Sequence, residues 1–205
     1  MTKVFIKKIT LDNNVDFEFS SYKKDKISRC TNKKRINELI QGEKLLVQAL
    51  SDLGLKCEIP LDIVTNEYGK PYLRDNKFFF NISHSKNYIA CAISLFEVGL
   101  DIEQIDDRYE NIIQKLLTTE ELKNNETNIE YLIKIWTVKE AYTKLIGTGI
   151  NMNLKEINTS SNGIENDFNI FLIEGAKIAN VITDGLSISV ASKNIENEVY
   201  IKMLN

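Results

Sequence analysis

Three acidic side chains in two short segments have the clearest capacity for chemistry in this chain. Asp101 and Glu103 lie in segment 98–103 (VGLDIE), where apolar and acidic residues alternate. Successive side chains of a strand point to opposite faces, so a strand here places both carboxylates on one face. Two such carboxylates repel each other unless a proton or a cation lies between them. With Glu140, they form a set of hard oxygen donors that suits Mg²⁺ or Mn²⁺.

Glu140 and Lys144 lie four residues apart in a helix predicted over 127–147. The buried stripe of that helix is expected to consist of Leu132, Ile135, Val138, Tyr142 and Leu145 at helical spacing. Trp136, Glu140 and Lys144 fall largely on another side. Glu140 and Lys144 have an alternative role as a surface ion pair, which contributes only ~0.3–0.5 kcal/mol.

Two further segments carry polar groups suited to phosphate. His84 is the only histidine and stands between Ser83 and Ser85, at the end of an aromatic strand. A serine hydrolase is disfavoured, because neighbouring strand side chains point apart and the chain has no GxSxG segment. Hydroxyls and an imidazole donate hydrogen bonds to phosphate oxygens, although a structural histidine is the simpler alternative.

Segment 66–72 (NEYGKPY) predicts a turn. Pro71 keeps Lys70 extended, and Gly69 lets the backbone approach a ligand closely. A plain reverse turn without a binding role is the alternative.

Two similar α+β halves are expected to position these residues. A strand near 1–9 and a helix over 33–53 precede strands at 59–65, 78–82, 88–94 and 98–103. A second helical block covers 109–147, with a new helix start near 118–120, and strands follow at 168–173, 176–182, 186–191 and 199–203. The order strand, helix, strands occurs twice, and segment 89–94 resembles segment 188–192. We expect subdomains at 1–100 and 101–205 with a ligand site at their interface.

Composition excludes several classes of protein. The chain has 205 residues, 43% hydrophobic, which suits a packed core. Its net charge of −3 argues against a general nucleic-acid binder. Segment 21–38 has seven basic and two acidic residues, 7 − 2 = +5, which favours a phosphorylated ligand or else forms a solvated helix surface. Scattered Cys30, Cys57 and Cys91, the lack of a signal peptide and the lack of a ~20-residue apolar run predict a cytoplasmic protein without membrane spans.

Four ordered motifs together resemble the surfactin-type 4′-phosphopantetheinyl transferase family. They are segments 66–71 (NEYGKP), 80–85 (FNISHS), 98–103 (VGLDIE) and 136–149 (WTVKEA, Lys144 and GTG). The resemblance extends loosely over nearly the whole chain. It implies an α+β pseudo-dimer, a monomer made of two similar subdomains. The implied reaction transfers the phosphopantetheine arm of coenzyme A to a serine of an acyl or peptidyl carrier protein and releases adenosine 3′,5′-bisphosphate. The pathway that the carrier serves stays open.

The resemblance also implies a role for particular residues. Asp101, Glu103 and Glu140 match the Mg²⁺ ligands, and Lys144 matches a cation near the diphosphate. Glu140 is also the expected base for the carrier serine, directly or through a water. The implied coenzyme A contacts are Lys23 and Lys26 for the 3′-phosphate, Gly69, Lys70 and Pro71 beside the adenine, and Ser83 and His84 at the nucleotide end.

Two positions depart from the family pattern. Glu38 stands four residues before Gly42, where a basic residue is common, so Arg35 is the expected substitute. Lys86 follows the Ser-His-Ser segment, where glycine is common, and either alters that loop or adds a cation. Two alternative functions remain: a catalytically silent protein that binds coenzyme A or a nucleotide, and a metal-dependent phosphohydrolase.

Overall fold

The computed structural model describes residues 1–10, 16–75, 77–123, 128–147, 152–165, 167–194 and 199–204. Its α-helices are α1 (Ser21–Ser28), α2 (Lys33–Asp52), α3 (Glu110–Ile113), α4 (Thr119–Lys123) and α5 (Ile129–Ile146). Its strands are β1 (Thr2–Lys8), β2 (Ile63–Thr65), β3 (Pro71–Leu73), β4 (Phe79–Ser85), β5 (Tyr88–Ser94), β6 (Gly99–Gln104), β7 (Ser160–Glu165), β8 (Phe168–Ile173), β9 (Ala176–Thr183), β10 (Leu186–Ser192) and β11 (Val199–Leu204).

The two halves of the chain repeat one topology. In the first, β1, α2, β4 and β5 follow in sequence, and the strands pair in the order β1-β5-β4. In the second, β6, α5, β9 and β10 follow, and the strands pair as β6-β10-β9. All these pairs are antiparallel. The similar segments 89–94 and 188–192 lie in β5 and β10, the middle strands of the repeated units, and the predicted α+β class is confirmed.

Additional strands extend each repeated unit. β8 and β7 continue the second sheet beyond β9, while β11 pairs in parallel with β1 and so joins the first sheet. β2 and β3 form a separate small hairpin. The predicted subdomain boundary at residue 100 falls within β6 and stays a prediction.

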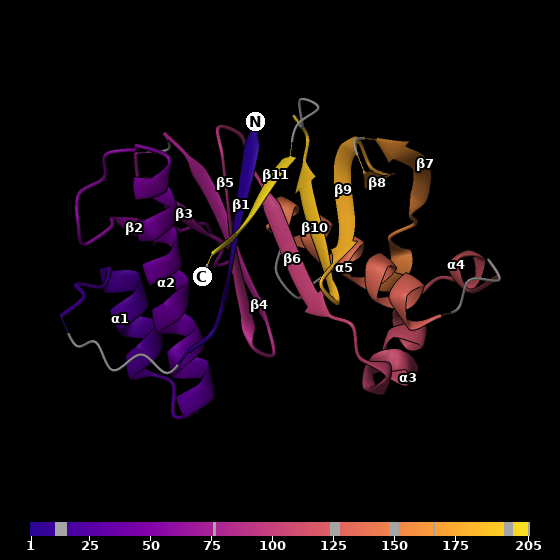
Figure 1. Cartoon of the computed structure of the whole chain (residues 1–205), viewed down its shortest axis with the longest axis horizontal. Helices are drawn as coiled ribbons and strands as arrows, with labels where there is room; N and C mark the ends of the chain where they lie inside the picture. The colour runs from indigo at the N-terminus through magenta and orange to yellow at the C-terminus, as the bar shows by residue number, and fades with distance from the viewer. Residues whose placement is uncertain are drawn as a thin grey trace.

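The molecule is layered, with α2 and α5 outside and the two sheets between them (Figure 1). One apolar cluster joins α2 to the first sheet, and another joins α5 to the second. A third cluster fills the space between the sheets and includes Leu100 and Ile102 of β6. Asp101 and Glu103 alternate with them and therefore face away from this third cluster, as strand alternation predicts.

The two sheets also meet edge to edge, where β4 and β6 are joined by side chains. The Leu100 N–H donates to Asn81 Oδ1 at 3.0 Å, and the Gln104 N–H donates to Ser85 Oγ at 3.0 Å. Between them the Ile102 N–H makes a longer contact of 3.4 Å with Ser83 Oγ. Alternate polar side chains of β4 thus accept hydrogen bonds from the backbone N–H groups on the edge of β6 that faces away from β10. Without these side chains that edge would be unpaired.

Helix ends follow local sequence signals. Asn32 and Asn128 accept backbone N–H bonds at the starts of α2 and α5, and Gly147, with φ of 73°, ends α5. Thr148 and Gly149, predicted to share that end, lie outside the described residues. The predicted helix start near 118–120 is confirmed, because Thr118 and Glu121 form a reciprocal capping box before α4.

Several predicted boundaries were wrong. The strand expected over 59–65 covers only 63–65, and β4 runs on to Ser85 instead of ending at 82. Strands β3 and β7 were not predicted from the sequence. No helix in the described ranges is long and apolar enough to cross a bilayer.

Candidate functional site

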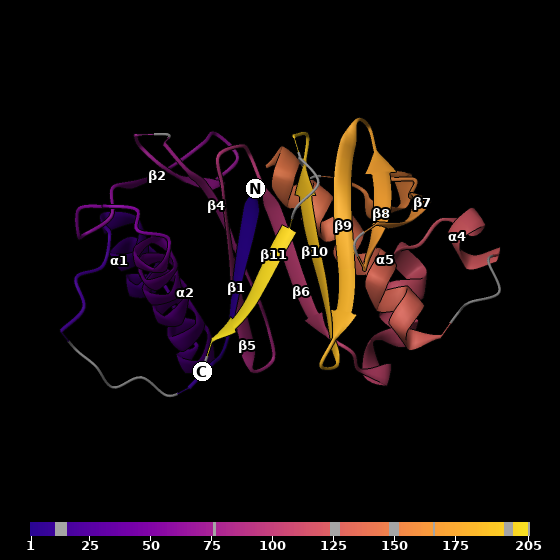
Figure 2. The same ribbon diagram turned by 45° about the horizontal axis from the view of Figure 1, so that its top comes forward.

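A cavity of about 620 Å³ lies between the two halves and contains every site residue predicted from the sequence. Its walls come from α1, α2, the 68–71 turn, β4, β6 and α5. Figure 2 shows α1 and α2 at the left, with β4 and β6 between them and α5. The predicted residues that line it are Lys23, Lys26, Gly69, Lys70, Pro71, Ser83, His84, Asp101, Glu103, Glu140 and Lys144. The cavity thus joins segments that are up to 121 residues apart in sequence (144 − 23).

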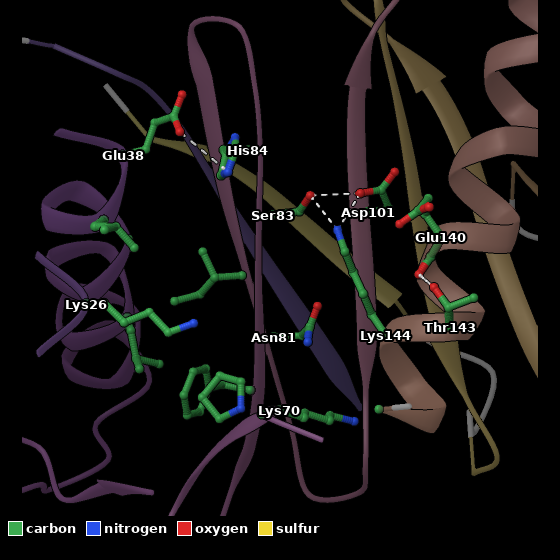
Figure 3. Close-up of a pocket in the computed structure, with 18 of the residues that line it drawn as sticks. Lys26, Glu38, Lys70, Asn81, Ser83, His84, Asp101, Glu140, Thr143 and Lys144 are labelled. Atoms are coloured by element: carbon green, nitrogen blue, oxygen red, sulfur yellow. Dashed lines mark hydrogen bonds and ion pairs between the residues drawn. The ribbon is translucent and has the colours of Figure 1, made fainter. Parts of the chain in front are cut away.

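Asp101 is the centre of a buried polar cluster. Its Oδ1 accepts a bond of 2.6 Å from Lys144 Nζ and one of 2.8 Å from Ser83 Oγ (Figure 3). Lys144 Nζ also donates to Ser83 Oγ at 3.0 Å. Lys144 therefore bridges α5 to β6 and β4. Among the described residues, Lys144 forms its ion pair with Asp101 and not the surface ion pair with Glu140 that was the alternative.

The two glutamates beside Asp101 have raised pKa values. Burial raises the pKa of Glu103 to about 7, with additional repulsion from Asp101 and Glu140, although a hydrogen bond from Ser85 Oγ opposes the shift. Burial and Asp101 likewise raise the pKa of Glu140 above its usual range, and Lys144 opposes this. The three carboxylates are thus close enough to interact electrostatically, and their charge is only partly compensated.

The chemistry of these residues fits a divalent cation. Asp101 Oδ2 is buried and has no hydrogen-bond partner in the described part of the chain. Such an orphaned oxygen, beside two carboxylates with raised pKa values, is relieved by a positive charge. In their present arrangement, no three His, Cys, Asp or Glu side chains among the described residues form a ready metal cluster. The three-carboxylate set therefore stays a prediction.

His84 lies within β4 and contacts α2. Its Nε2 accepts from Arg35 Nη1 and lies 3.5 Å from Glu38 Oε2, while Arg35 Nη1 donates to the same Glu38 oxygen at 3.1 Å. Burial lowers the pKa of His84, and the nearby Glu38 carboxylate acts in the opposite direction. Glu38, which departs from the family pattern, and Arg35, its expected substitute, therefore meet at His84 on the cavity wall.

Two lysines of α1 supply positive charge at the α2 side of the cavity. The Lys23 side chain is buried, and burial lowers its pKa to about 8, although Glu43 opposes the shift. Lys26 is exposed, with its Nζ 5.2 Å from the centroid of the Tyr22 ring. An anion that enters here would stabilise the charged form of Lys23.

The 66–71 turn is tied to the end of α5. Asn66 Oδ1 accepts from the backbone N–H groups of Tyr68 and Lys70, which closes the turn. Lys70 Nζ then donates to the carbonyl of Leu145 at 2.7 Å. Burial lowers the pKa of Lys70. The lysine caps the negative end of the helix that carries Glu140 and Lys144.

Lys86 does not add a cation to the cavity. It follows β4 with φ of 48°, a left-handed conformation that glycine adopts without strain, and its Nζ pairs with Asp106. Several side chains that line the cavity were not predicted from the sequence, namely Tyr22, Glu43, Tyr68, Met152 and Leu154. Their apolar or ordinary surface context gave no signal in the sequence.

The site and the two-half topology define a protein with a cavity between its halves that is lined by acidic and basic groups. Residues 97–190 match the model of the 4′-phosphopantetheinyl transferase superfamily, and the chain belongs to this superfamily.

Named relatives agree with this assignment. The chain is 33% identical over 146 residues to the 4′-phosphopantetheinyl transferase gsp of Aneurinibacillus migulanus, covering 67% of this chain and 60% of that protein. It is 27% identical to the 4′-phosphopantetheinyl transferase Sfp of Bacillus subtilis, covering 66% and 63%. It is also 35% identical to the L-aminoadipate-semialdehyde dehydrogenase-phosphopantetheinyl transferase of Candida glabrata, covering 49% and 44%. The chain therefore spans less than two thirds of the length of these relatives.

Proposed function

We propose that this protein transfers the 4′-phosphopantetheine arm of coenzyme A to a serine hydroxyl of an apo acyl or peptidyl carrier protein. The single observation that carries the proposal is the cavity between the halves, where three interacting carboxylates face Lys144, His84 and the lysines of α1. Family membership and the printed names of the relatives support it.

The donor would lie along the cavity with its phosphates near the cations. Lys23 and Lys26 supply charge for the 3′-phosphate at one end, and the 69–71 turn offers its backbone and Pro71 to the adenine. Ser83 and His84 on β4 would hold the nucleotide end, with His84 on a phosphate, and Ser83 also contacts Asp101 and Lys144, beside which the diphosphate would be held. Hydrogen bonds from these donors to phosphate oxygens would fix the donor before reaction.

The proposed reaction breaks the phosphoanhydride bond within the diphosphate of coenzyme A and forms a phosphoester bond to the carrier serine. The carrier serine oxygen attacks the phosphorus that bears the pantetheine arm, and the bridging oxygen leaves with adenosine 3′,5′-bisphosphate. Glu140, whose raised pKa makes it a better proton acceptor than an exposed glutamate, would take the serine proton directly or through a water. Lys144 Nζ would stabilise negative charge on the departing diphosphate oxygen.

A divalent cation would be held by Asp101, Glu103 and Glu140. When bound, Mg²⁺ would supply neutralisation of the diphosphate charge. The same carboxylate serves poorly as both ligand and base, so the two roles proposed for Glu140 compete.

The test is incubation of the purified protein with coenzyme A, Mg²⁺ and a panel of apo carrier proteins, followed by intact-protein mass measurement. We expect a mass gain of one phosphopantetheine on at least one carrier and loss of the gain with Glu140→Gln. Glu130→Gln is the matched control, because Glu130 is an exposed carboxylate on the same helix. Tight coenzyme A binding in calorimetry without transfer to any carrier would favour a silent binding protein. Free phosphopantetheine released without a carrier would favour a phosphohydrolase.

A further inference from the structure

A buried hydrogen-bond network lies between α5 and the second sheet, outside the cavity wall, and its Asn180 Oδ1 has no hydrogen-bond partner among the described residues. It consists of Thr137 on α5, Ser187 and Ser189 on β10, and Asn180 on β9, each 0% exposed. Thr137 Oγ1 lies 2.9 Å from both serine Oγ atoms, and Asn180 Nδ2 lies 2.9 Å and 3.0 Å from the same two atoms. The Thr137 hydroxyl donates to the carbonyl of Lys134 at 3.0 Å.

These contacts permit one consistent direction of donation. Each hydroxyl has one hydrogen, and an amide has two. The amide of Asn180 can donate to both serines, the serines to Thr137, and Thr137 to the helix backbone, while the Ile188 carbonyl oxygen, 3.2 Å from Asn180 Nδ2, competes for the two amide hydrogens. The network therefore connects strand β9 to α5 through directional bonds.

The network lies level with the acidic residues of β6. Across the β10–β6 pairing, Ser189 is opposite Asp101 and Ser187 is opposite Glu103. On the other side of β10, Ser189 is opposite Asn180. On α5, Glu140 follows Thr137 by three residues and so lies on a neighbouring part of the helix surface. The hydrogen bonds between α5 and β10 therefore lie at the same level of the sheet as the carboxylates of β6.

The first half of the molecule shows that this fold does not need such a network. There, the middle strand β5 presents Ile89, Cys91 and Ile93 to α2 in an apolar cluster. The equivalent strand β10 presents Ser187 and Ser189 at this level instead, and only Ala191 joins the apolar cluster of α5. Buried polar groups are less favourable than well-packed apolar ones unless every bond is made. Their presence in the half that contributes Glu140 and Lys144 indicates a role beyond folding.

We infer that Thr137, with Ser187, Ser189 and Asn180, is a positioning group that fixes α5 on the sheet and so sets where Glu140 and Lys144 stand relative to Asp101. The apolar side chains of α5 supply non-directional attraction, which tolerates small shifts of a helix along a sheet. The hydroxyl bonds tolerate them poorly, because hydrogen bonds weaken steeply with distance and angle. This inference rests on the proposed function of the same site.

The test compares Thr137→Val with two other variants on α5. Valine keeps the shape of threonine and removes its hydroxyl, while Thr137→Ser restores a hydroxyl. Ile135→Val is the control, since Ile135 is buried on the same helix and belongs to the apolar cluster. We expect Thr137→Val to lower kcat by on the order of 10–100-fold with little change in KM for coenzyme A. Thr137→Ser should recover most of that rate, and Ile135→Val should keep kcat while lowering the melting temperature.

A second measurement does not depend on transfer. Trp136, the only tryptophan of the chain, lines the cavity, so quenching of its fluorescence reports Mn²⁺ binding. Misplacement of Glu140 in Thr137→Val should weaken Mn²⁺ binding by about tenfold or more. Loss of groups that orient metal ligands commonly has an effect of this size. If Thr137→Val does not fold, Ser189→Ala replaces it, because Thr137 then keeps its contact with Ser187 and the same effects should be smaller.

Equal kcat and equal Mn²⁺ affinity in Thr137→Val and Ile135→Val would overturn the inference and leave the proposed function standing. A wild-type protein that transfers nothing would overturn the proposed function, and the Mn²⁺ titration would then decide the inference by itself. A wild-type protein that neither transfers nor binds Mn²⁺ would refute both.

Discussion

Replacement of Gly99 by alanine should separate α5 from β6. A Cβ at this position would lie 2.0 Å from the Ala141 carbonyl oxygen and 2.5 Å from the Leu145 nitrogen. Ordinary contacts of a Cβ begin at 3.4 Å, so the helix backbone would have to move by 3.4 − 2.0 = 1.4 Å. Because both neighbours are backbone atoms, no side-chain rotation relieves the clash.

The expected cost lies at the upper end of the range for overpacked cores, about 3 kcal/mol. At about 2–4 °C per kcal/mol for a protein of this size, the melting temperature should fall by roughly 6–12 °C. The helix that moves carries Glu140 and Lys144, so transfer should fall by about 100-fold even at temperatures where the variant is folded. Scanning calorimetry and the carrier mass assay measure the two effects.

Gly42→Ala is the matched control for stability. Gly42 lies inside α2, and an added Cβ would meet only the side chains of Ile82 and Ile89, at 3.4 Å. Alanine is favoured over glycine in a helix interior by about 0.5–1 kcal/mol, so this variant should be neutral or slightly more stable. If Gly99→Ala melts within about 2 °C of the wild type and transfers normally, the tight contact between β6 and α5 is not as described.

Three further predictions concern charged side chains. Lys139→Met should lower the free energy of unfolding by about 3–5 kcal/mol, because Lys139 is buried and donates to Glu121 at 2.7 Å. Lys134→Met on the same helix should cost far less, and equal melting temperatures for the two variants would contradict this prediction. Without divalent cations, the stability contributed by protonated Glu103 should be present below pH 4.5 and lost as the pH rises through its folded pKa of about 7, by at most about 3 kcal/mol. The free energy of unfolding from denaturant titrations should therefore fall more between pH 5 and pH 8 for the wild type than for Glu103→Gln. Lys86→Gly should relieve the left-handed backbone strain by about 1 kcal/mol and lose an ion pair of similar size, so the free energy of unfolding should change little. In an Asp106→Asn background, where the ion pair is already absent, Lys86→Gly should raise the free energy of unfolding. A lower value there would show that Lys86 is not strained.

The sequence predicted what depends on short-range patterns. Alternation along 98–103 placed Asp101 and Glu103 on one face, and helical spacing placed the buried stripe of α5 correctly. The repeated order of strands and helix predicted two similar halves, and the echo between 89–94 and 188–192 proved to be one of equivalent strands. The alternation and the helical spacing each lie within one short segment of the chain, and the repeat is found by comparing such segments.

Partners chosen across the fold left no comparable signal. Lys144 could bond to Glu140 or to Asp101 by spacing alone, and only the packing of α5 against β6 selects Asp101. The contact of Arg35 with His84 and the capping of Leu145 by Lys70 likewise depend on how separate elements meet. Ser187 and Ser189 look like ordinary strand residues until Thr137 is placed above them.

The pairing of β11 with β1 has a consequence for biosynthesis. Thr2 aligns with Val199, so β1 gains this outer neighbour only after residues 199–204 have been translated. Until then the nascent first half carries an open edge, which invites pairing with other chains. Closure of that edge joins residues almost 200 positions apart, and such distant contacts form slowly. We expect the late step of folding to be the addition of this final strand.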